Sequence, residues 1–236
     1  PNVVQPNAEA LYLIRAPKMP QVQEIYERIN KIARGAAMMT ETEVEIQFVK
    51  ALANVIPNRT LAQVMQRCAE AIPASEYTEE EKAYARSLIS ADAAAKDAEG
   101  FLRKYRDPQV AEQLRKTVRE PLQGKIWPLM DIEDTCPASS DLGDVSWICP
   151  SVQLCHTTCA AGTVSHSWQM VAQGKTSVAH KGMVYAAKVM ASTAVELFEN
   201  PQLIAEARKE LDQRLGEDKY VNPIPAEVKP PIPQQK

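Results

Sequence analysis

Three histidines are the side chains in this chain best suited to proton transfer or metal binding, and they stand at positions 156, 166 and 180 of 236 residues. His166 lies within GTVSHSWQMVAQG, where it follows a glycine-containing turn and comes shortly before a tryptophan. Loops beyond strand ends often display ligand groups in α/β proteins. A single imidazole cannot carry out a reaction alone, so the spacing leaves two interpretations open: a functional ligand and an ordinary turn histidine.

His180 occupies a different setting, one turn into a helix that we expect to begin at Ser177. Near a helix N-terminus an imidazole tends to stay neutral, because the positive end of the helix dipole disfavours a second positive charge. We therefore interpret His180 as a residue that makes a structural hydrogen bond within its loop.

The cluster CPSVQLCHTTC invites comparison with a zinc knuckle, but its spacing does not fit. Three residues separate Cys155 from Cys159, His156 follows the first of them, and no second ligand pair comes later in the chain. Structural zinc sites draw four ligands from two turns, so we interpret these cysteines as buried strand residues. Five cysteines, an odd number, in a chain rich in alanine and charged residues predict reduced thiols and a cytoplasmic location.

Composition and motif content narrow the classes of function. The formal net charge of −3 and the absence of a basic block argue against a nucleic-acid partner. No run of about 18 apolar residues occurs, so we predict no membrane span. The sequence also lacks a Gly-x-Ser-x-Gly elbow, a His-Glu-x-x-His helix and a Walker loop.

The first 56 residues have the pattern strand, helix, strand. Segment 8–15 has strand composition, and segment 20–39 places apolar residues at helical spacing. Segment 42–49 alternates strictly between apolar and polar residues, which is typical of a half-solvated strand. Two strands and one helix are marginal alone, so we expect missing sequence or a partner chain to complete them.

Helical patterns dominate the chain after Pro57, where the register changes. A capping box at Thr78 predicts a helix start, and Asn200 with Pro201 predicts another. The remaining predictions are helices over 58–72, 79–89 and 177–199, helical stretches within 92–118, a loop over 127–143, and one or two strands within 145–160.

The chain begins at Pro1, without a methionine and only a few residues before the first predicted strand. Natural domains usually have slack at their ends. We therefore interpret the sequence as the middle of a longer protein.

Several segments, read in order, resemble one protein family. SSDLGDVSW, GTVSHSWQMVAQGK, AHKGMVYAAKVMA and PIPAEVKPP are similar to the C-terminal half of the M20-type metallo-amidohydrolases, in the aminobenzoyl-glutamate hydrolase branch. The opening PNVVQPNAEALYLIRAPKM resembles the second half of that family's inserted lid. One departure is Ala138, where the family usually has glycine, and it affects only the local loop geometry.

The resemblance implies an α/β (α+β) fold. It implies part of a metallopeptidase-like catalytic domain with a mixed sheet, and part of a smaller ferredoxin-like lid or dimerisation domain. The expected division places the second half of the lid at 1–56, the C-terminal part of the catalytic domain at 57–222 and a proline-rich tail at 223–236.

The resemblance also implies the site residues. The family binds two divalent metal ions, zinc or manganese, which activate a water for amide hydrolysis, and His166 occupies the position of its last metal ligand. Asn2 and Arg15 match the lid residues that grip the carboxylate of the substrate or polarise its carbonyl. The other metal ligands and the general base would lie upstream of this chain, so no catalytic base is assigned.

We expect the C-terminal portion of a metal-dependent amidohydrolase that cleaves p-aminobenzoyl-glutamate or a similar N-acyl amino acid. The chain by itself should be inactive. Its expected partners are the small-molecule amide, the missing N-terminal half of the enzyme, and a second subunit that makes a homodimer or hetero-oligomer through the lid. The alternative is a non-catalytic binding or assembly subunit that lacks the metal-binding half.

Overall fold

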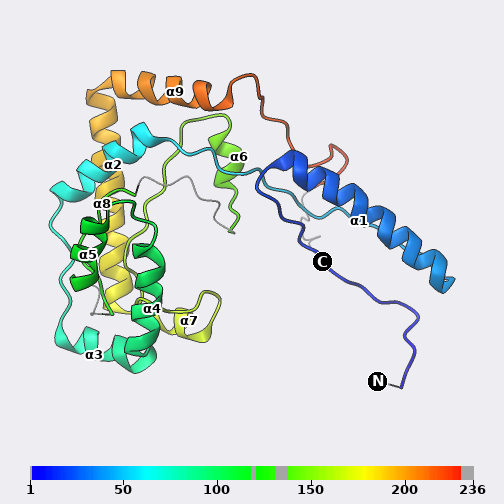
Figure 1. The fold of residues 1–236 in the computed structure, drawn as a ribbon, viewed down its shortest axis with the longest axis horizontal. Helices are drawn as coiled ribbons and strands as arrows, with labels where there is room; N and C mark the ends of the chain where they lie inside the picture. Colours follow the sequence, from blue (N-terminus) through cyan, green and yellow to red (C-terminus); the bar gives the residue numbers. More distant parts are fainter. Residues whose placement is uncertain (1, 118–120, 131–137, 230–236) are drawn as a thin grey trace, which may run out of the picture. The chain divides into compact units, whose positions relative to one another are not determined.

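The chain folds into helices joined by irregular segments (Figure 1), and this computed structural model describes residues 2–117, 121–130 and 138–229. In chain order, the helices of these residues are α1 (Met19–Thr40), α2 (Arg59–Ala71), α3 (Glu79–Leu88), α4 (Ala91–Leu102), α5 (Pro108–Thr117), α6 (Leu142–Ser146), α7 (Trp168–Gln173), α8 (Ser177–Glu199) and α9 (Pro201–Leu215). The chain divides into two compact units. Unit 1 is Pro1–Ile56, Thr135–Ile148 and Glu217–Lys236, and unit 2 is Pro57–Asp134 and Cys149–Gly216.

The predicted α/β fold is wrong for the described residues, because none of them forms a strand. The segments 8–15 and 42–49 are irregular, and 145–160 is irregular beyond the end of α6. Alternating apolar residues suit an extended backbone, but a strand also needs a neighbour that exchanges hydrogen bonds with it. Within the described residues these segments have no such neighbour. The mixed sheet and the ferredoxin-like lid implied by the family resemblance are therefore not observed.

The helix predictions are confirmed more closely. α1 matches the predicted helix over 20–39, and α2, α3 and α8 match their predicted ranges within one or two residues. α9 begins at the predicted Pro201. An α-helix has 3.6 residues per turn and forms its backbone hydrogen bonds between residues close in the sequence. Apolar spacing therefore predicts a helix without reference to any distant segment. The predicted loop over 127–143 is interrupted at its end by the short helix α6.

Unit 1 contains a close contact between α6 and the segment that precedes α2. A Cβ atom at Gly143 would lie 1.9 Å from the carbonyl oxygen of Ala53, so only glycine fits there. The buried hydroxyl of Ser146 accepts a hydrogen bond from the Ile56 N–H at 2.8 Å, and the Trp147 Nε1–H donates to the Asn54 carbonyl at 2.8 Å. These long-range contacts fix the chain immediately before it enters unit 2.

Helices α2, α8 and α9 pack against one another in unit 2 (Figure 1). Met65 and Ala69 of α2 form a buried cluster with Tyr185 and Val189 of α8. The Tyr185 hydroxyl is satisfied inside this cluster, because it donates to the Ala69 carbonyl at 2.6 Å. Burying an aromatic side chain of this size contributes on the order of 2–3 kcal/mol.

A carboxylate of α9 caps the N-terminus of α2. Glu210 accepts hydrogen bonds at 2.8 Å from the backbone N–H groups of Arg59 and Thr60 and from the Thr60 hydroxyl. Burial alone would raise the pKa of Glu210, but these donors and Arg214 lower it to about 2. Asn58 joins the same two helices, since its side chain accepts from the Leu61 N–H and donates to the Ala207 carbonyl.

Another carboxylate, Glu81, is buried and connects α3 to α8. It completes the predicted capping box by accepting from the Thr78 N–H at 2.7 Å, and it also accepts from Ser177 and from Lys181, the latter at 2.7 Å. Burial by itself would raise the pKa of Glu81, but hydrogen bonds from Lys181, Ser177 and Thr78 outweigh it and lower the pKa from 4.5 to about 2. The negative charge of Glu81 is therefore stabilised by hydrogen bonds from residues distant in the sequence.

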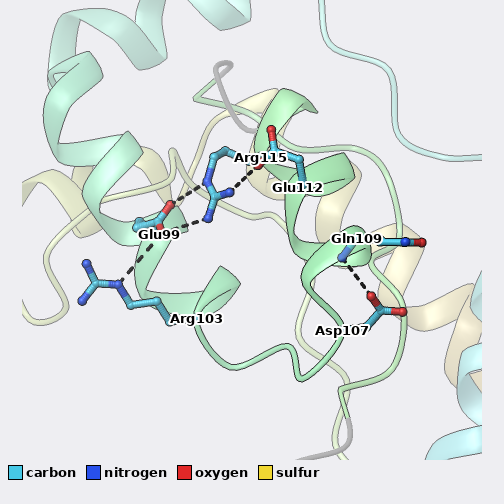
Figure 2. Close-up of polar contacts among 6 residues, drawn as sticks. All are labelled: Glu99, Arg103, Asp107, Gln109, Glu112 and Arg115. Carbon is cyan, nitrogen blue, oxygen red and sulfur yellow. Dashed lines mark hydrogen bonds and ion pairs between the residues drawn. The ribbon is translucent and has the colours of Figure 1, made fainter.

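Figure 2 shows the polar contacts of the α4–α5 hairpin. Arg115 of α5 donates to both carboxylate oxygens of Glu99 in α4 at 3.1 Å, and Glu112 accepts from the same guanidinium. Asp107 begins α5 by accepting from the Gln109 N–H at 2.8 Å. Because this network is exposed, we expect it to contribute little to stability.

None of the described helices is both long and apolar enough to cross a membrane.

The Glu81 contacts predict a specific loss of stability in acid. Because the folded-state pKa of Glu81 is depressed, its carboxylate stabilises the fold above pH 4.5, and this stabilisation is lost as the pH falls from 4.5 towards 2. Glu81→Gln should lower the free energy of unfolding at pH 7 by about 1–3 kcal/mol. The difference between the variant and the wild type should shrink as the pH approaches 2. Urea unfolding across this range measures both effects.

Glu79→Gln is the matched control, because Glu79 lies in the same helical turn but its side chain is exposed. It should change the free energy of unfolding by less than about 0.5 kcal/mol. Equal effects of the two substitutions would contradict the buried role of Glu81.

Candidate functional site

His166 lies in a turn immediately before α7, and its side chain is exposed. Its backbone has a φ of 60°, in the left-handed region that residues other than glycine seldom adopt. Such a conformation costs about 1–3 kcal/mol and persists only where the surroundings impose it. The exposed imidazole therefore belongs to a residue whose backbone conformation is locally unfavourable.

His166 lies in a loop that we call the His166 loop, residues 160–167, and the first half of this loop is anchored in unit 2. Ala160 is 1% exposed and belongs to a core cluster that includes Val178 of α8. Gly162 has a φ of +81°, and a Cβ atom added there would come within 2.7 Å of the Ala93 backbone carbon at the start of α4. The Gly162 N–H donates to the Asp97 carboxylate at 3.1 Å. The loop therefore leaves the core along the surface of α4.

The second half of the loop is fixed by Ser167, the N-cap of α7. Its hydroxyl accepts from the Met170 N–H at 3.3 Å and donates to the Val164 carbonyl at 2.6 Å. His166 therefore lies between an anchored first half and a capped helix start.

The two residues that the family resemblance assigns to the substrate, Asn2 and Arg15, lie in unit 1. Both are exposed in irregular segments. Arg15 donates from one guanidinium nitrogen to the Ser139 hydroxyl at 3.4 Å. His166 belongs to unit 2, so neither unit by itself brings all three residues together.

A complete metal centre is not present in the described residues, where no three potential ligands among His, Cys, Asp and Glu converge. His166 alone would supply a single nitrogen. The described residues therefore supply at most part of the two-metal centre that the family resemblance implies, and any such centre would need further ligands from residues outside this set.

The cysteines of the CPSVQLCHTTC segment are less buried than the sequence predicts. Cys155 is exposed, Cys159 is only partly buried, and neither lies in a strand, so the prediction of buried strand cysteines is wrong. Cys136 lies outside the described residues. The four cysteines that the structure describes, including Cys68 and Cys149, are free.

His156 has a defined environment that the sequence did not reveal. Its ring stacks on Tyr185 with centroids 4.1 Å apart, and its Nε2 lies 3.3 Å from the Ser75 hydroxyl. Burial lowers the pKa of His156, which favours the neutral ring. No carboxylate is hydrogen-bonded to this ring among the described contacts, so the Ser75–His156 pair lacks the orienting acid of a nucleophilic triad.

His180 faces an open pocket of about 470 Å³ beside this pair. The lining comes from the segment after α2 and from α8, and consists of Ile72, Pro73, Ala74, Ser75, Glu76, His180, Lys181, Val184, Tyr185 and Lys188. The predicted structural hydrogen bond of His180 is not among the contacts of the described residues. Lys181, which also lines this pocket, donates to the Glu81 carboxylate and to the Glu76 carbonyl.

Known proteins provide independent information on this chain. It is 44% identical to a p-aminobenzoyl-glutamate hydrolase subunit of Escherichia coli (strain K12) over 237 residues, which cover 98% of the chain and 48% of that protein. It is 25% identical to Xaa-Arg dipeptidase of Mus musculus over 94% of the chain and 40% of that enzyme. The Homo sapiens Xaa-Arg dipeptidase is 21% identical, also over 40% of its length.

The chain thus spans about half the length, or less, of the curated relatives it matches. No protein-family model matches it, and no solved structure matches it significantly.

The Gly162 contact predicts that this glycine is required for the loop. Gly162→Ala should lower the free energy of unfolding by about 1–3 kcal/mol, because the new methyl group meets the Ala93 backbone and the backbone keeps a positive φ. Gly100→Ala, in α4 of the same unit with open space around it, should be neutral or raise stability by up to about 1 kcal/mol. Thermal unfolding of both variants measures the contrast, and a neutral Gly162→Ala would show that the loop leaves α4 in solution.

Proposed function

We propose that this chain is part of an amidohydrolase. Its similarity to a p-aminobenzoyl-glutamate hydrolase subunit and to Xaa-Arg dipeptidase agrees with the resemblance to the M20-type family. The proposed reaction is hydrolysis of the amide bond of p-aminobenzoyl-glutamate or of a similar N-acyl amino acid. The observation that carries the proposal is 44% identity over 98% of the chain. The activity is proposed for a longer protein, since this chain spans 48% of that relative.

We assign His166 as one ligand of a centre with two divalent metal ions, zinc or manganese. An imidazole suits either metal, and the exposed ring of His166 on a fixed loop leaves its nitrogens accessible. The described residues do not supply the other ligands. The proposal therefore requires ligands and a general base from the rest of the longer protein, and the chain alone should be inactive.

Arg15 and Asn2 are assigned to the substrate. A guanidinium binds a carboxylate through two parallel hydrogen bonds, and glutamate-bearing amides carry such carboxylates. The exposure of Arg15 at the end of its segment supports this role. The assignment of 1–56 to a lid and of 57–222 to a catalytic domain remains part of this proposal.

The Escherichia coli relative is named as one subunit of a hydrolase, which supports a protein partner for the longer enzyme. We propose that the partner is a second copy or a different polypeptide. The free thiols agree with a reducing compartment such as the cytoplasm. A non-catalytic binding or assembly role is the alternative, and the His166 experiment below distinguishes it.

His166→Ala in the longer enzyme should reduce kcat by at least about 100-fold and weaken metal retention, whatever amide is tested. The reason is that a lost ligand affects the metal itself and not the recognition of one substrate. Metal content by elemental analysis and steady-state kinetics measure the two effects. His180→Ala, which also removes an exposed imidazole, is the control and should change kcat less than about twofold. Full metal content and full rate in His166→Ala would remove the ligand assignment, and a wild-type enzyme with no metal and no amidase activity would favour the alternative.

Arg15→Ala should behave differently, because the proposed contact is remote from the metals. Metal content should stay unchanged, and kcat/KM for glutamate-bearing amides should fall by at least about 30-fold, as expected when a charge-assisted bidentate contact of about 2–4 kcal/mol is lost. Analogues with a blocked carboxylate should be affected much less. Arg15→Lys should restore only part of the loss, because lysine lacks the planar fork. Equal losses on free and blocked substrates would contradict this role.

A further inference from the structure

A buried amide lies beneath the His166 loop. Gln173, the last residue of α7, is 3% exposed, although most glutamines of globular proteins lie at the surface. A buried amide is costly unless its hydrogen bonds are made, so its partners indicate what it holds in place.

The Gln173 amide bonds to both the beginning and the middle of the loop. Its Oε1 accepts from the Ala160 N–H at 2.7 Å, and its Nε2 donates to the Thr163 hydroxyl oxygen at 3.0 Å. The same nitrogen donates to the Gln169 carbonyl at 3.1 Å. The reversed amide would set its NH₂ group against the Ala160 N–H, so only one orientation satisfies all three contacts.

The partners of Gln173 are themselves fixed. The Thr163 hydroxyl donates to the Ala160 carbonyl at 2.6 Å, which closes a small ring of hydrogen bonds around the amide. On the other side, the Thr176 hydroxyl donates to the Gln173 carbonyl at 2.7 Å and also caps α8. Gln173 therefore connects the start of the long helix α8 to the loop three residues before His166.

We propose that Gln173 is the positioning residue that holds the His166 loop in the conformation that exposes the imidazole. The inference rests on the proposed function of His166, but the contacts that carry it belong to this chain. Ala160 and Gly162 anchor one side of the loop, and Ser167 begins α7 on the other. Gln173 joins Ala160 and Thr163 to α7, in addition to the Ser167–Val164 hydrogen bond, and its amide thereby supports the loop in which His166 adopts a positive φ.

The test measures the motion of the loop in the full chain. Gln173→Met keeps the side-chain length and removes the amide. Backbone ¹⁵N order parameters of residues 164–167 should fall from about 0.85 in the wild type to below about 0.6. Thr163→Val removes one of the three amide contacts together with the Thr163–Ala160 hydrogen bond, but it keeps the Gln173–Ala160 contact and should give a smaller decrease in the same residues.

A matched control separates positioning from a general loss of stability. Thr193 is a buried residue of α8 whose hydroxyl donates to the Val189 carbonyl at 2.8 Å, far along the helix from the loop. Thr193→Val removes a buried hydrogen bond but no contact of the loop, so it should leave the order parameters of residues 164–167 unchanged, whatever its effect on the melting temperature.

A rescue with pH adds a readout that a purely structural role would not give. In Gln173→Glu, the new carboxyl keeps an acceptor for the Ala160 N–H, but when ionised it repels the Gln169 carbonyl. When protonated it regains a donor. The loop should therefore be mobile near pH 8 and regain order as the pH falls and this carboxyl takes up a proton.

The proposal is overturned if the loop stays rigid in Gln173→Met, if it loosens equally in Thr193→Val, or if acid gives no recovery in Gln173→Glu. These measurements do not depend on the reaction. If Gln173→Met frees the loop while His166→Ala leaves metal content and rate intact, the positioning role stands and the function assigned to His166 falls.

Discussion

The backbone of the segment before the His166 loop runs so close to helix α8 that only glycine fits at position 182. A Cβ atom there would lie 2.1 Å from the Thr157 carbonyl oxygen. This oxygen belongs to the backbone, so it cannot move aside as the end of a flexible side chain could. This contact places Val152 and Leu154 against the cluster of α2 and α8, and it allows the His156 ring to stack on Tyr185. It also leads the chain into the core at Ala160, from which the His166 loop begins. The position of the candidate ligand therefore depends on packing along α8.

The charged groups of unit 2 reinforce the same arrangement. Glu81 and Glu210 are carboxylates with little exposure, and each accepts backbone N–H groups at a helix start, where the unsatisfied donors and the helix dipole favour negative charge. In the case of Glu81, Ser177 and Lys181 of α8 complete the compensation. In the case of Glu210, the carboxylate comes from α9 and the donors from α2. Each charge thus orients one helix against another, because moving either helix would leave the carboxylate uncompensated.

The candidate site combines a conformation that is unfavourable locally with contacts that maintain it. His166 adopts a positive φ, while Gly162, Ser167 and Gln173 remove the alternatives that the loop would otherwise adopt. Strain that is held by surrounding structure is common at functional positions. In this chain the contacts that hold the loop come from α4, α7 and the start of α8.

The sequence by itself determined the helices α1, α2, α3, α8 and α9, because a helix closes its hydrogen bonds within a few residues and its apolar spacing indicates the face that it buries. The short helices α6 and α7 were not predicted. The capping box of Thr78 and Glu81 and the proline start of α9 were predictable for the same local reason. Family resemblance singled out His166, Asn2 and Arg15, whose roles remain predictions. The strands predicted over 8–15, 42–49 and 145–160 were wrong, since alternation describes an extended backbone and cannot supply the neighbour that a sheet requires. Only the tertiary structure decided that Glu81 would meet Lys181, that Gly162 would press on α4, and that Gln173 would bind Ala160. Each of these depends on residues brought together by packing, and no local pattern in the sequence encodes which distant partner a buried polar group will find.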